Sequence, residues 1–331
     1  MKFLQIVPHL PPPCEGVGAY AAALAGALGG ETRFLVGDPA WPGTGNGARA
    51  VPARTAADLL AAIGAEETVL LHYANYGYQP RGCPEWLVAG LDRWGGRLVT
   101  VFHEVWASGP PWTSSFWLRP AQRRLAATLA RRSEALATTL DIYAGMLRPW
   151  SRGGEIAVLP VFSTVGEPAA VPPFGERTRR IVVFGGAGVR SRAYGRFLPE
   201  LAKAAAALGA GEILDIGPPL PLPAAAGGVP IRPLGVLPAG EVSALLLGSA
   251  AGFLAYPPDF LPKSTIFAAY CAHGALPVCA WDRGGDRQAA DGAPCWTGAG
   301  DPEPAARAAR GWYAGHSLER QAVRFRELLA A

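Results

Sequence analysis

Short apolar runs alternate with stretches of mixed polarity along the first half of the chain. The runs that are rich in leucine, valine, isoleucine and phenylalanine cover residues 2–7, 32–37, 68–74 and 97–104. Helical spacing is found at 56–65, at 84–94 and in a longer stretch at 119–133, and two further strand-like runs follow at 134–139 and 156–161. Strands buried on both faces and separated by helices are typical of a parallel sheet covered by helices on each side. The pattern predicts a doubly wound α/β domain.

The same alternation begins again after a stretch rich in proline, glycine and charge. Strands are predicted at 180–186, 212–217, 231–235, 251–256 and 275–280, and helices at 191–208, 240–249 and 265–273. A final polar–apolar helix at 317–331 could pack on its own domain or cross back to the first. We therefore divide the chain into a domain at 1–165, a linker at 166–180, a second Rossmann-like domain at 181–311 and a C-terminal helix segment at 312–331. Two such domains predict a ligand cleft, because open α/β sheets bind ligands at the carboxyl ends of their strands.

Composition and charge narrow the class of protein. The 331 residues suit about two domains of roughly 150 residues, half of them are hydrophobic, and the net charge is only +4. Five arginines gather on one predicted helix, and they are Arg119, Arg123, Arg124, Arg131 and Arg132. Such a cluster could attract nucleic acid, an anionic lipid surface or a phosphorylated acceptor, but we favour a solvated helix face. We expect no nucleic-acid partner and leave peripheral membrane contact open.

The cysteines and the apolar stretches indicate a cytoplasmic protein. The five cysteines are odd in number, scattered and without C-x-x-C spacing, so neither a disulfide framework nor a zinc site is expected. The N-terminus lacks the pattern of a signal peptide, and no apolar stretch approaches the ~20 residues that span a bilayer. Cytoplasmic location, with peripheral contact at the inner membrane face left open, is the expectation.

A glycine-rich stretch follows the first predicted strand. Gly16, Val17 and Gly18 fit the G-x-G-x-x-G/A spacing of a dinucleotide-binding turn, and Asp38 lies where such an enzyme keeps an acid for the ribose. That fingerprint requires a strand that runs straight into the first glycine. Here a long proline-rich loop intervenes. The stretch therefore predicts a helix that opens at the end of a loop, and a nicotinamide-dependent enzyme is a less favoured alternative.

Two strand ends in the second half have residues suited to a diphosphate. "VVFGGAGVRSR" ends a strand in glycines and opens a helix, so Gly186, Gly188, Arg190 and Arg192 are candidate ligands. Small residues let the backbone come close, the helix N-terminus carries partial positive charge, and arginine adds bidentate contacts. A glycine-rich turn with solvated arginines is the structural alternative.

The second of these strand ends lies in "AYPPDFLPKSTIFAAY". Lys263, Ser264 and Thr265 stand at the start of an apolar helix that follows the strand predicted at 251–256. Ser264 or Thr265 could simply cap that helix, and Lys263 could simply be solvated. Two helix N-termini with cationic side chains favour a diphosphate over either structural role.

A histidine and a glutamate end a buried strand in the first half. His103 and Glu104 are followed by a loop dense in tryptophan, proline and serine, and several tyrosines follow the neighbouring strand. Charged groups that bond hydroxyls beside aromatic rings that stack on sugar C–H surfaces suit a polyhydroxylated ligand. We therefore take His103 and Glu104 as candidate catalytic residues. Tyr76 and Trp112 are candidates for sugar or acceptor contacts, although core packing would explain each aromatic alone.

At these residues the chain resembles glycosyltransferases of the GT-B fold, in particular the retaining "group 1" transferases of family 4, over nearly its whole length. "GVGAY" is similar to the family's first glycine loop, and "VTVFHE" to the strand that ends in a histidine facing the transferred sugar. "VVFGGAGVRSR" resembles the segment whose basic residue holds the donor diphosphate. The resemblance implies two Rossmann-like domains, a nucleoside diphosphate sugar as donor, a saccharide, lipid-linked or small-molecule hydroxyl as acceptor, and retention of anomeric configuration.

The chain departs from that family in one place. The family's two glutamates would fall on Phe260 and Ala268, and Asp259 could replace the first of them. No D-x-D stretch occurs, so we expect no metal and no other cofactor, with positive side chains and helix dipoles stabilising the departing diphosphate. A relative that binds a sugar nucleotide without ordinary transfer is the alternative that the missing glutamates favour.

Overall fold

The computed structural model describes residues 2–11, 16–43, 47–65, 68–153, 155–282 and 294–330, and they form two compact units. The first comprises the chain up to Pro160 together with the C-terminal stretch from Leu318, and the second runs from Val161 to Ser317. Residues 166–180, predicted as a linker, lie inside the second unit, where they include the short helix η3 (Phe174–Glu176) and the start of strand β8.

The first unit is built on a parallel sheet of seven strands in the order β3-β2-β1-β4-β5-β6-β7. The strands are β1 (Lys2–Val7), β2 (Glu31–Val36), β3 (Ala48–Ala50), β4 (Thr68–Tyr73), β5 (Arg97–Phe102), β6 (Ala135–Thr138) and β7 (Ala157–Val158). The order of the strands reverses between β1 and β4. In a doubly wound sheet this reversal is the topological switch point, where the loops that follow the two strands diverge and leave room for a ligand.

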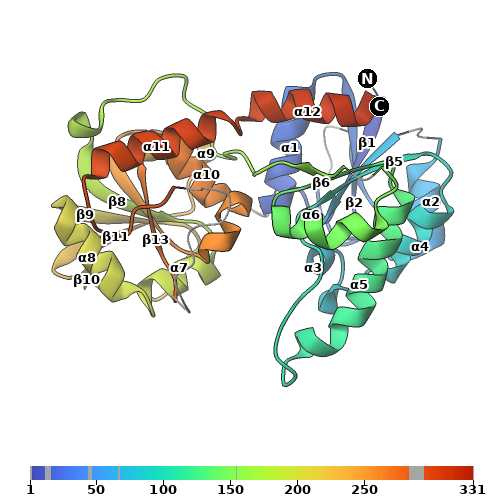
Figure 1. The fold of residues 1–331 in the computed structure, drawn as a ribbon, viewed down its shortest axis with the longest axis horizontal. Helices are drawn as coiled ribbons and strands as arrows, with labels where there is room; N and C mark the ends of the chain where they lie inside the picture. The colour runs from blue at the N-terminus through green and yellow to red at the C-terminus, as the bar shows by residue number, and fades with distance from the viewer. Residues whose placement is uncertain are drawn as a thin grey trace. The chain divides into compact units, whose positions relative to one another are not determined.

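Helices cover the sheet of the first unit (Figure 1). They are α1 (Gly16–Leu28), α2 (Ala56–Ile63), α3 (Asn75–Tyr78), α4 (Glu85–Arg93), α5 (Ser114–Arg132), α6 (Asp141–Leu147) and α12 (Leu318–Ala330), with short 3-10 turns η1 (Pro80–Gly82) and η2 (Arg148–Trp150). Helix α12 packs against α1, and the Tyr20 hydroxyl of α1 donates a hydrogen bond of 2.8 Å to the side-chain carbonyl of Gln321. The C-terminal helix thus packs on the first unit.

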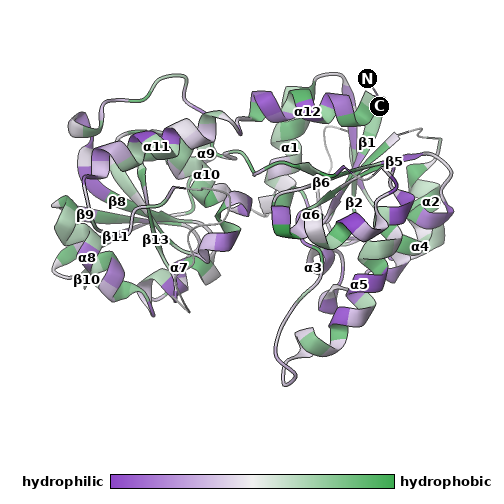
Figure 2. Ribbon diagram, in the orientation of Figure 1, coloured by the Kyte–Doolittle hydropathy of each residue, from purple (hydrophilic) through white to green (hydrophobic). Residues whose placement is uncertain are grey.

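Hydropathy follows this layering, with apolar strands inside and mixed helices outside (Figure 2). Helix α5 illustrates the rule. Leu125 and Leu129 lie on its buried face, whereas Arg123 and Arg131 lie on its exposed face. Burial of that apolar stripe, rather than intrinsic helix propensity, stabilises the helix in place.

The second unit has a six-stranded sheet in the order β10-β11-β9-β8-β12-β13. Its strands are β8 (Thr178–Phe184), β9 (Glu212–Ile216), β10 (Ala225–Ala226), β11 (Val229–Gly235), β12 (Ser249–Ala255) and β13 (Leu276–Ala280), and all pairings are parallel except that of β10 with β11. Here the order reverses between β8 and β12. The loops after these two strands are therefore the expected ligand-binding loops of this unit.

The helices of the second unit correct one prediction. They are α7 (Ala187–Tyr194), α8 (Leu198–Leu208), α9 (Ala239–Leu247), α10 (Thr265–Ala272) and α11 (Pro302–Ala314), with the 3-10 helix η4 (Pro258–Lys263). The single helix predicted at 191–208 is wrong, because the chain breaks at Gly195 and restarts. Pro199 lies in the first turn of α8, where its missing N–H costs nothing, and it was the sequence signal for this restart.

Candidate functional site

Helix α7 presents its first turn at the switch point of the second unit. Gly185 has a φ of +123°, and Gly186 caps the helix. Gly186 and Gly188 are exposed, and a Cβ added at either would meet no atom within 4 Å. The packing of the protein therefore does not require these two glycines. Their smallness leaves the N–H groups at the positive end of the helix open to an anion.

Arg190 does not point toward that opening, contrary to the prediction that it binds a donor diphosphate. Its guanidinium is 1% exposed and forms a bidentate ion pair with Asp215 on β9, with Nε 2.8 Å from Oδ1 and Nη2 on Oδ2. Nη1 donates to the carbonyl of Pro218 at 2.6 Å. Because its donors hold α7 to the end of β9 and to the turn that follows it, Arg190 has a structural role. Arg192, two positions later, is exposed on α7.

The N-terminus of α10 lies after the neighbouring strand, β12. Ser264 caps the helix, because its hydroxyl accepts a hydrogen bond of 3.2 Å from the amide of Phe267. Thr265 is the first residue of α10 and is half-buried. Lys263 and Asp259 lie on η4, and the Lys263 ammonium is 5.8 Å from the centre of the Phe260 ring. Adjacent strands of one sheet thus end in helix N-termini, as the sequence indicated.

In the first unit the glycine pair lies inside a helix. Gly16 and Val17 begin α1, and Gly18 is buried in its first turn. A Cβ at Gly18 would overlap the carbonyl oxygen of His9, so this glycine is required for the close approach of α1 to the loop after β1. The glycines are not in a strand-to-helix turn, which argues against a dinucleotide fingerprint. The carboxylate of Asp38 is engaged locally, by Arg54 and the amide of Ala40.

His103 lies directly after β5, where its amide donates to the carbonyl of Tyr73 at 2.9 Å. The residue is only 7% exposed, and its ring stacks on that of His72 with the centroids 5.4 Å apart. His103 Nε2 is 3.1 Å from His72 Nδ1, and His72 Nε2 is 2.6 Å from the side-chain oxygen of Gln5 on β1. Burial, with a smaller effect from His103, holds the pKa of His72 well below its ordinary value. His72 is therefore neutral.

Sequence reasoning missed Gln5. It stands in the middle of the run "KFLQIV", where a polar residue in a buried strand requires a partner. That requirement was the available signal.

Glu104 follows His103 and is half-buried. Its charge contributes, after burial, to raising the pKa of Tyr73 and of Tyr143, which places its carboxylate near both phenols. Tyr76 on α3 is 45% exposed, and its hydroxyl accepts a hydrogen bond of 3.1 Å from Gln122. These side chains surround the ends of β4 and β5, as predicted.

Trp112 lies in the loop before α5, and the start of α5 extends away from the rest of the first unit (Figure 1). Trp112 is 85% exposed and Trp117 is 73% exposed.

Among the described residues, no helix is long and apolar enough to cross a membrane.

The arginine cluster divides into two groups. Arg119, Arg123, Arg124 and Arg131 border a surface hollow of about 460 Å³ together with Trp150. Arg132 instead donates to backbone carbonyls at the end of α4 and beyond, a structural role.

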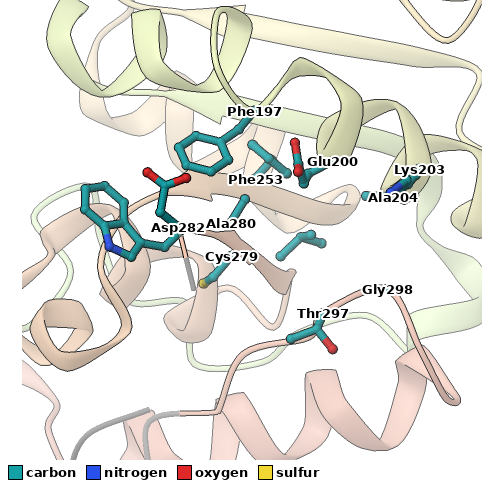
Figure 3. A pocket seen from close by; sticks show the side chains of 12 residues that line it. Phe197, Glu200, Lys203, Ala204, Phe253, Cys279, Ala280, Asp282, Thr297 and Gly298 are labelled. Carbon is teal, nitrogen blue, oxygen red and sulfur yellow. The ribbon is translucent and has the colours of Figure 1, made fainter. Parts of the chain in front are cut away.

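A separate cavity of about 410 Å³ lies in the second unit between α8 and β13 (Figure 3). Glu200 and Lys203 of α8 line it, together with Trp281 and Asp282 after β13. None of the residues predicted to bind the donor lines this cavity.

Three of the cysteines that are scattered in the sequence gather in space. Cys279 on β13 has a side-chain hydrogen bond with Cys295, and both lie close to Cys271 on α10. Burial is the main reason that the pKa values of Cys271 and Cys279 are raised. All three are thiols in the structure.

Comparison with known proteins identifies the fold. No protein-family model matches the chain, and no curated protein sequence matches it. Solved structures do match along nearly its full length. AviGT4, a glycosyltransferase involved in avilamycin A biosynthesis, is 16% identical with a TM-score of 0.53, over 99% of this chain and 97% of that one. An alpha-glucosyltransferase in complex with UDP and a 13-mer DNA is 10% identical with a TM-score of 0.63, over 100% of both chains.

A third similar structure is the alpha,alpha-trehalose 6-phosphate synthase of Burkholderia multivorans. It is 11% identical with a TM-score of 0.56, over 100% of this chain and 98% of that one. The two doubly wound units and these neighbours together define the GT-B fold, as the resemblance predicted. At such low identity the likeness establishes the architecture, and function has to be argued from the site.

Proposed function

We propose that this protein transfers a sugar from a nucleoside diphosphate sugar to a hydroxyl acceptor. The observation that carries the proposal is the pair of helix N-termini, α7 and α10, at the ends of the adjacent strands β8 and β12 of a GT-B fold. The order of the sheet reverses between these strands, which is where doubly wound sheets bind nucleotides. The exposed turn at Gly186 and Gly188 offers backbone N–H groups to an anion without steric obstruction.

In this proposal the donor diphosphate is held by the first turn of α7, by Arg192 and by the Lys263–Thr265 turn before α10. A departing diphosphate gains negative charge, and preorganised helix dipoles and cationic side chains stabilise that charge. Positive side chains would then do what a metal ion does in other transferases, so we propose transfer without a metal. Similar structures carry UDP or a UDP sugar, so UDP is the first nucleotide to test.

The remaining assignments rest on the family resemblance. By that resemblance, His103 contacts the transferred sugar and Glu104 lies beside it. The resemblance also implies that the reaction retains the anomeric configuration. Tyr76, Trp112 and Asp259 are proposed as contacts for sugar or acceptor. The acceptor hydroxyl is proposed to belong to a saccharide, a lipid-linked molecule or a small molecule.

The test is nucleotide binding followed by turnover. Thermal unfolding is measured with UDP, GDP, ADP and NAD, and the stabilising nucleotide is then supplied as its sugar conjugates while release of free nucleoside diphosphate is followed. We expect one nucleoside diphosphate to raise the melting temperature and its sugar conjugate to be consumed. Stabilisation without turnover of any sugar donor would favour a binding protein of the same fold, consistent with Phe260 and Ala268 at the family's glutamate positions. Stabilisation by NAD alone would refute the proposal.

Two substitutions locate the diphosphate. Lys263→Ala should weaken nucleoside diphosphate binding by about 1.5–3 kcal/mol, the range for hydrogen bonds to charged groups. Gly188→Val should weaken it as well, because the new side chain would fill the open space beside the first turn of α7. A Cβ added at Gly188 would meet no atom within 4 Å, so the melting temperature of the nucleotide-free Gly188→Val variant should change little. Unchanged nucleotide affinity in both variants would remove this site from the proposal.

We propose in addition that the first unit contacts an anionic membrane surface peripherally. Four exposed arginines on α5 and the exposed tryptophans at its start support this, since interfacial tryptophan and basic charge favour anionic lipid. Sedimentation with vesicles of phosphatidylcholine, with and without phosphatidylglycerol, tests it. Equal sedimentation with both vesicles would refute the proposal.

A further inference from the structure

Three buried side chains form a hydrogen-bonded chain across neighbouring strands of the first unit. Gln5 lies in β1, His72 in β4, and His103 follows β5, and these strands are adjacent in the sheet. Gln5 and His72 are fully buried, and His103 is nearly so. A hydrogen bond of 2.6 Å joins His72 Nε2 to the side-chain oxygen of Gln5, and one of 3.1 Å joins His72 Nδ1 to His103 Nε2.

The position of each proton follows from the acceptor at the end of this chain. A neutral imidazole has one N–H and one acceptor nitrogen. The side-chain oxygen of Gln5 can only accept, so His72 carries its proton on Nε2 and its Nδ1 is an acceptor. His103 must then donate through Nε2–H to His72 Nδ1. One amide oxygen therefore sets the tautomer of two successive histidines.

The rings are also held in place mechanically. The Tyr20 ring meets both edge-on, with centroids 5.1 Å from that of His103 and 5.9 Å from that of His72. The hydroxyl of Tyr78 donates to the carbonyls of Ile6 and His72 at 3.0 Å each, which fixes β4 against β1 at this level. A ring enclosed in this way cannot rotate to exchange its two nitrogens without breaking packing.

We propose that His72, held by Gln5, is a positioning residue that fixes the orientation and the tautomer of His103. The importance of this positioning for catalysis rests on the proposed function, in which His103 contacts the transferred sugar. In that tautomer the Nε2–H of His103 is committed to His72, so this N–H does not donate to a sugar hydroxyl. In metal sites, substitution of a partner that orients a ligating histidine lowers metal affinity or activity by about tenfold to a hundredfold, and we expect a loss of similar size here.

The first experiment examines the wild-type protein, and variants serve only to assign its resonances. Nitrogen-15 NMR of the whole protein, with histidine resonances assigned by single His→Gln substitutions, reports which nitrogen of each ring carries the proton. We expect protonated Nε2 in both His72 and His103. A wild-type His103 protonated at Nδ1 and not at Nε2 would overturn the proposal, whatever the activity of the protein.

Variants then test the direction of control. His72→Phe keeps a ring of similar size but removes the acceptor, so His103 should populate both tautomers. Gln5→Met should release the tautomer of His72 in the same way, and it is the second variant should His72→Phe fail to fold. His72→Gln restores an oxygen that can accept from His103 and should return its single tautomer. The proposal would be overturned if the tautomer population of His103 were unchanged in His72→Phe and that of His72 were unchanged in Gln5→Met.

Kinetics separates positioning from structural damage. With a turned-over sugar donor, His72→Phe should lower kcat about tenfold or more while the KM for the donor stays within about twofold, and His72→Gln should recover much of kcat. Equal loss in kcat and in nucleotide affinity, without recovery in His72→Gln, would assign His72 a structural role and overturn the proposal. If the wild-type protein turned over no donor, the proposed function would fail, yet the tautomer measurement would still decide whether Gln5 and His72 control His103.

Discussion

Arg190 and Arg192 lie two residues apart on α7, and the structure predicts opposite consequences of replacing them. Arg190 is buried against Asp215, with both side chains 1% exposed, whereas Arg192 is exposed. Arg190→Met removes the cation and leaves the Asp215 carboxylate buried. That carboxylate lies close to Tyr194, and it raises the pKa of the Tyr194 phenol in addition to the larger effect of burial. Breaking a buried ion pair by removing one partner costs about 3–5 kcal/mol.

The loss is expected in the second unit, because the pair joins α7 to β9, and β9 is paired with β8 in the sheet. Native-state hydrogen exchange of amides in β8 and β9 measures it without requiring the whole chain to unfold in one step. Since about 1.4 kcal/mol corresponds to a tenfold change, exchange of the slowest amides there should become about a hundredfold to a few thousandfold faster. The double variant Arg190→Met/Asp215→Leu should recover most of the loss, because an apolar pair needs no compensating charge.

Arg192→Met is the matched control. It removes the same charge from the same helix, and an exposed substitution of this kind changes stability by only about 0.5 kcal/mol or less. Under the proposed function it should instead weaken nucleoside diphosphate binding. Equal amide exchange rates in Arg190→Met and Arg192→Met would refute the structural role of Arg190. Weaker nucleoside diphosphate binding in Arg190→Met but not in Arg192→Met would assign Arg190 to the diphosphate site.

Three further outcomes are expected. Burial lowers the pKa values of His72 and His273, so the unfolded chain binds more protons than the folded chain once the pH falls below about 6.5. The stability that these neutral histidines contribute is fully present above that pH and should fall by at most about 1.4 kcal/mol per pH unit for each, until the pKa of that histidine in the folded protein is reached; melting temperatures measured against pH test this. Gly18→Ala should destabilise the first unit by about 1–3 kcal/mol through overlap with a backbone carbonyl, whereas Gly16→Ala, with open space around it, should not; similar urea midpoints would contradict this. Tyr20→Phe removes the hydrogen bond between α1 and α12 and should cost about 1–3 kcal/mol, measured by exchange of the α12 amides.

The sequence was sufficient to predict most strands of the two sheets because those strands are buried on both faces, but it did not predict the short edge strands β3 and β10. Continuous apolar runs such as residues 68–74 and 251–256 have few other interpretations when helical spacing separates them. The boundaries of β1 match the prediction residue for residue. Helix α11 was not predicted. Its buried face consists of Ala306, Ala309 and Tyr313, and a stripe made mostly of alanine is a weak apolar signal in sequence.

The site was harder to predict because local patterns do not say which way a side chain points. "VVFGGAGVRSR" placed two arginines at a helix start, but only the position of Asp215, 25 residues further on, decides that one of them turns inward. Likewise, His103 was visible at a strand end, whereas its link to Gln5 spans strands far apart in the chain. Such pairings are fixed by sheet order, which no short stretch of sequence contains.

The return of α12 to the first unit has a consequence for how the chain is made. The amide of Gln321 donates to the Pro160 carbonyl, and its oxygen receives the Tyr20 hydroxyl, so the last helix closes a gap left by the first 160 residues. On the ribosome, the second unit emerges complete while the first still lacks one wall. A stalled or shortened chain would therefore have an ordered second unit and a first unit whose α1 surface is uncovered, and that surface would be accessible to chaperones and proteases.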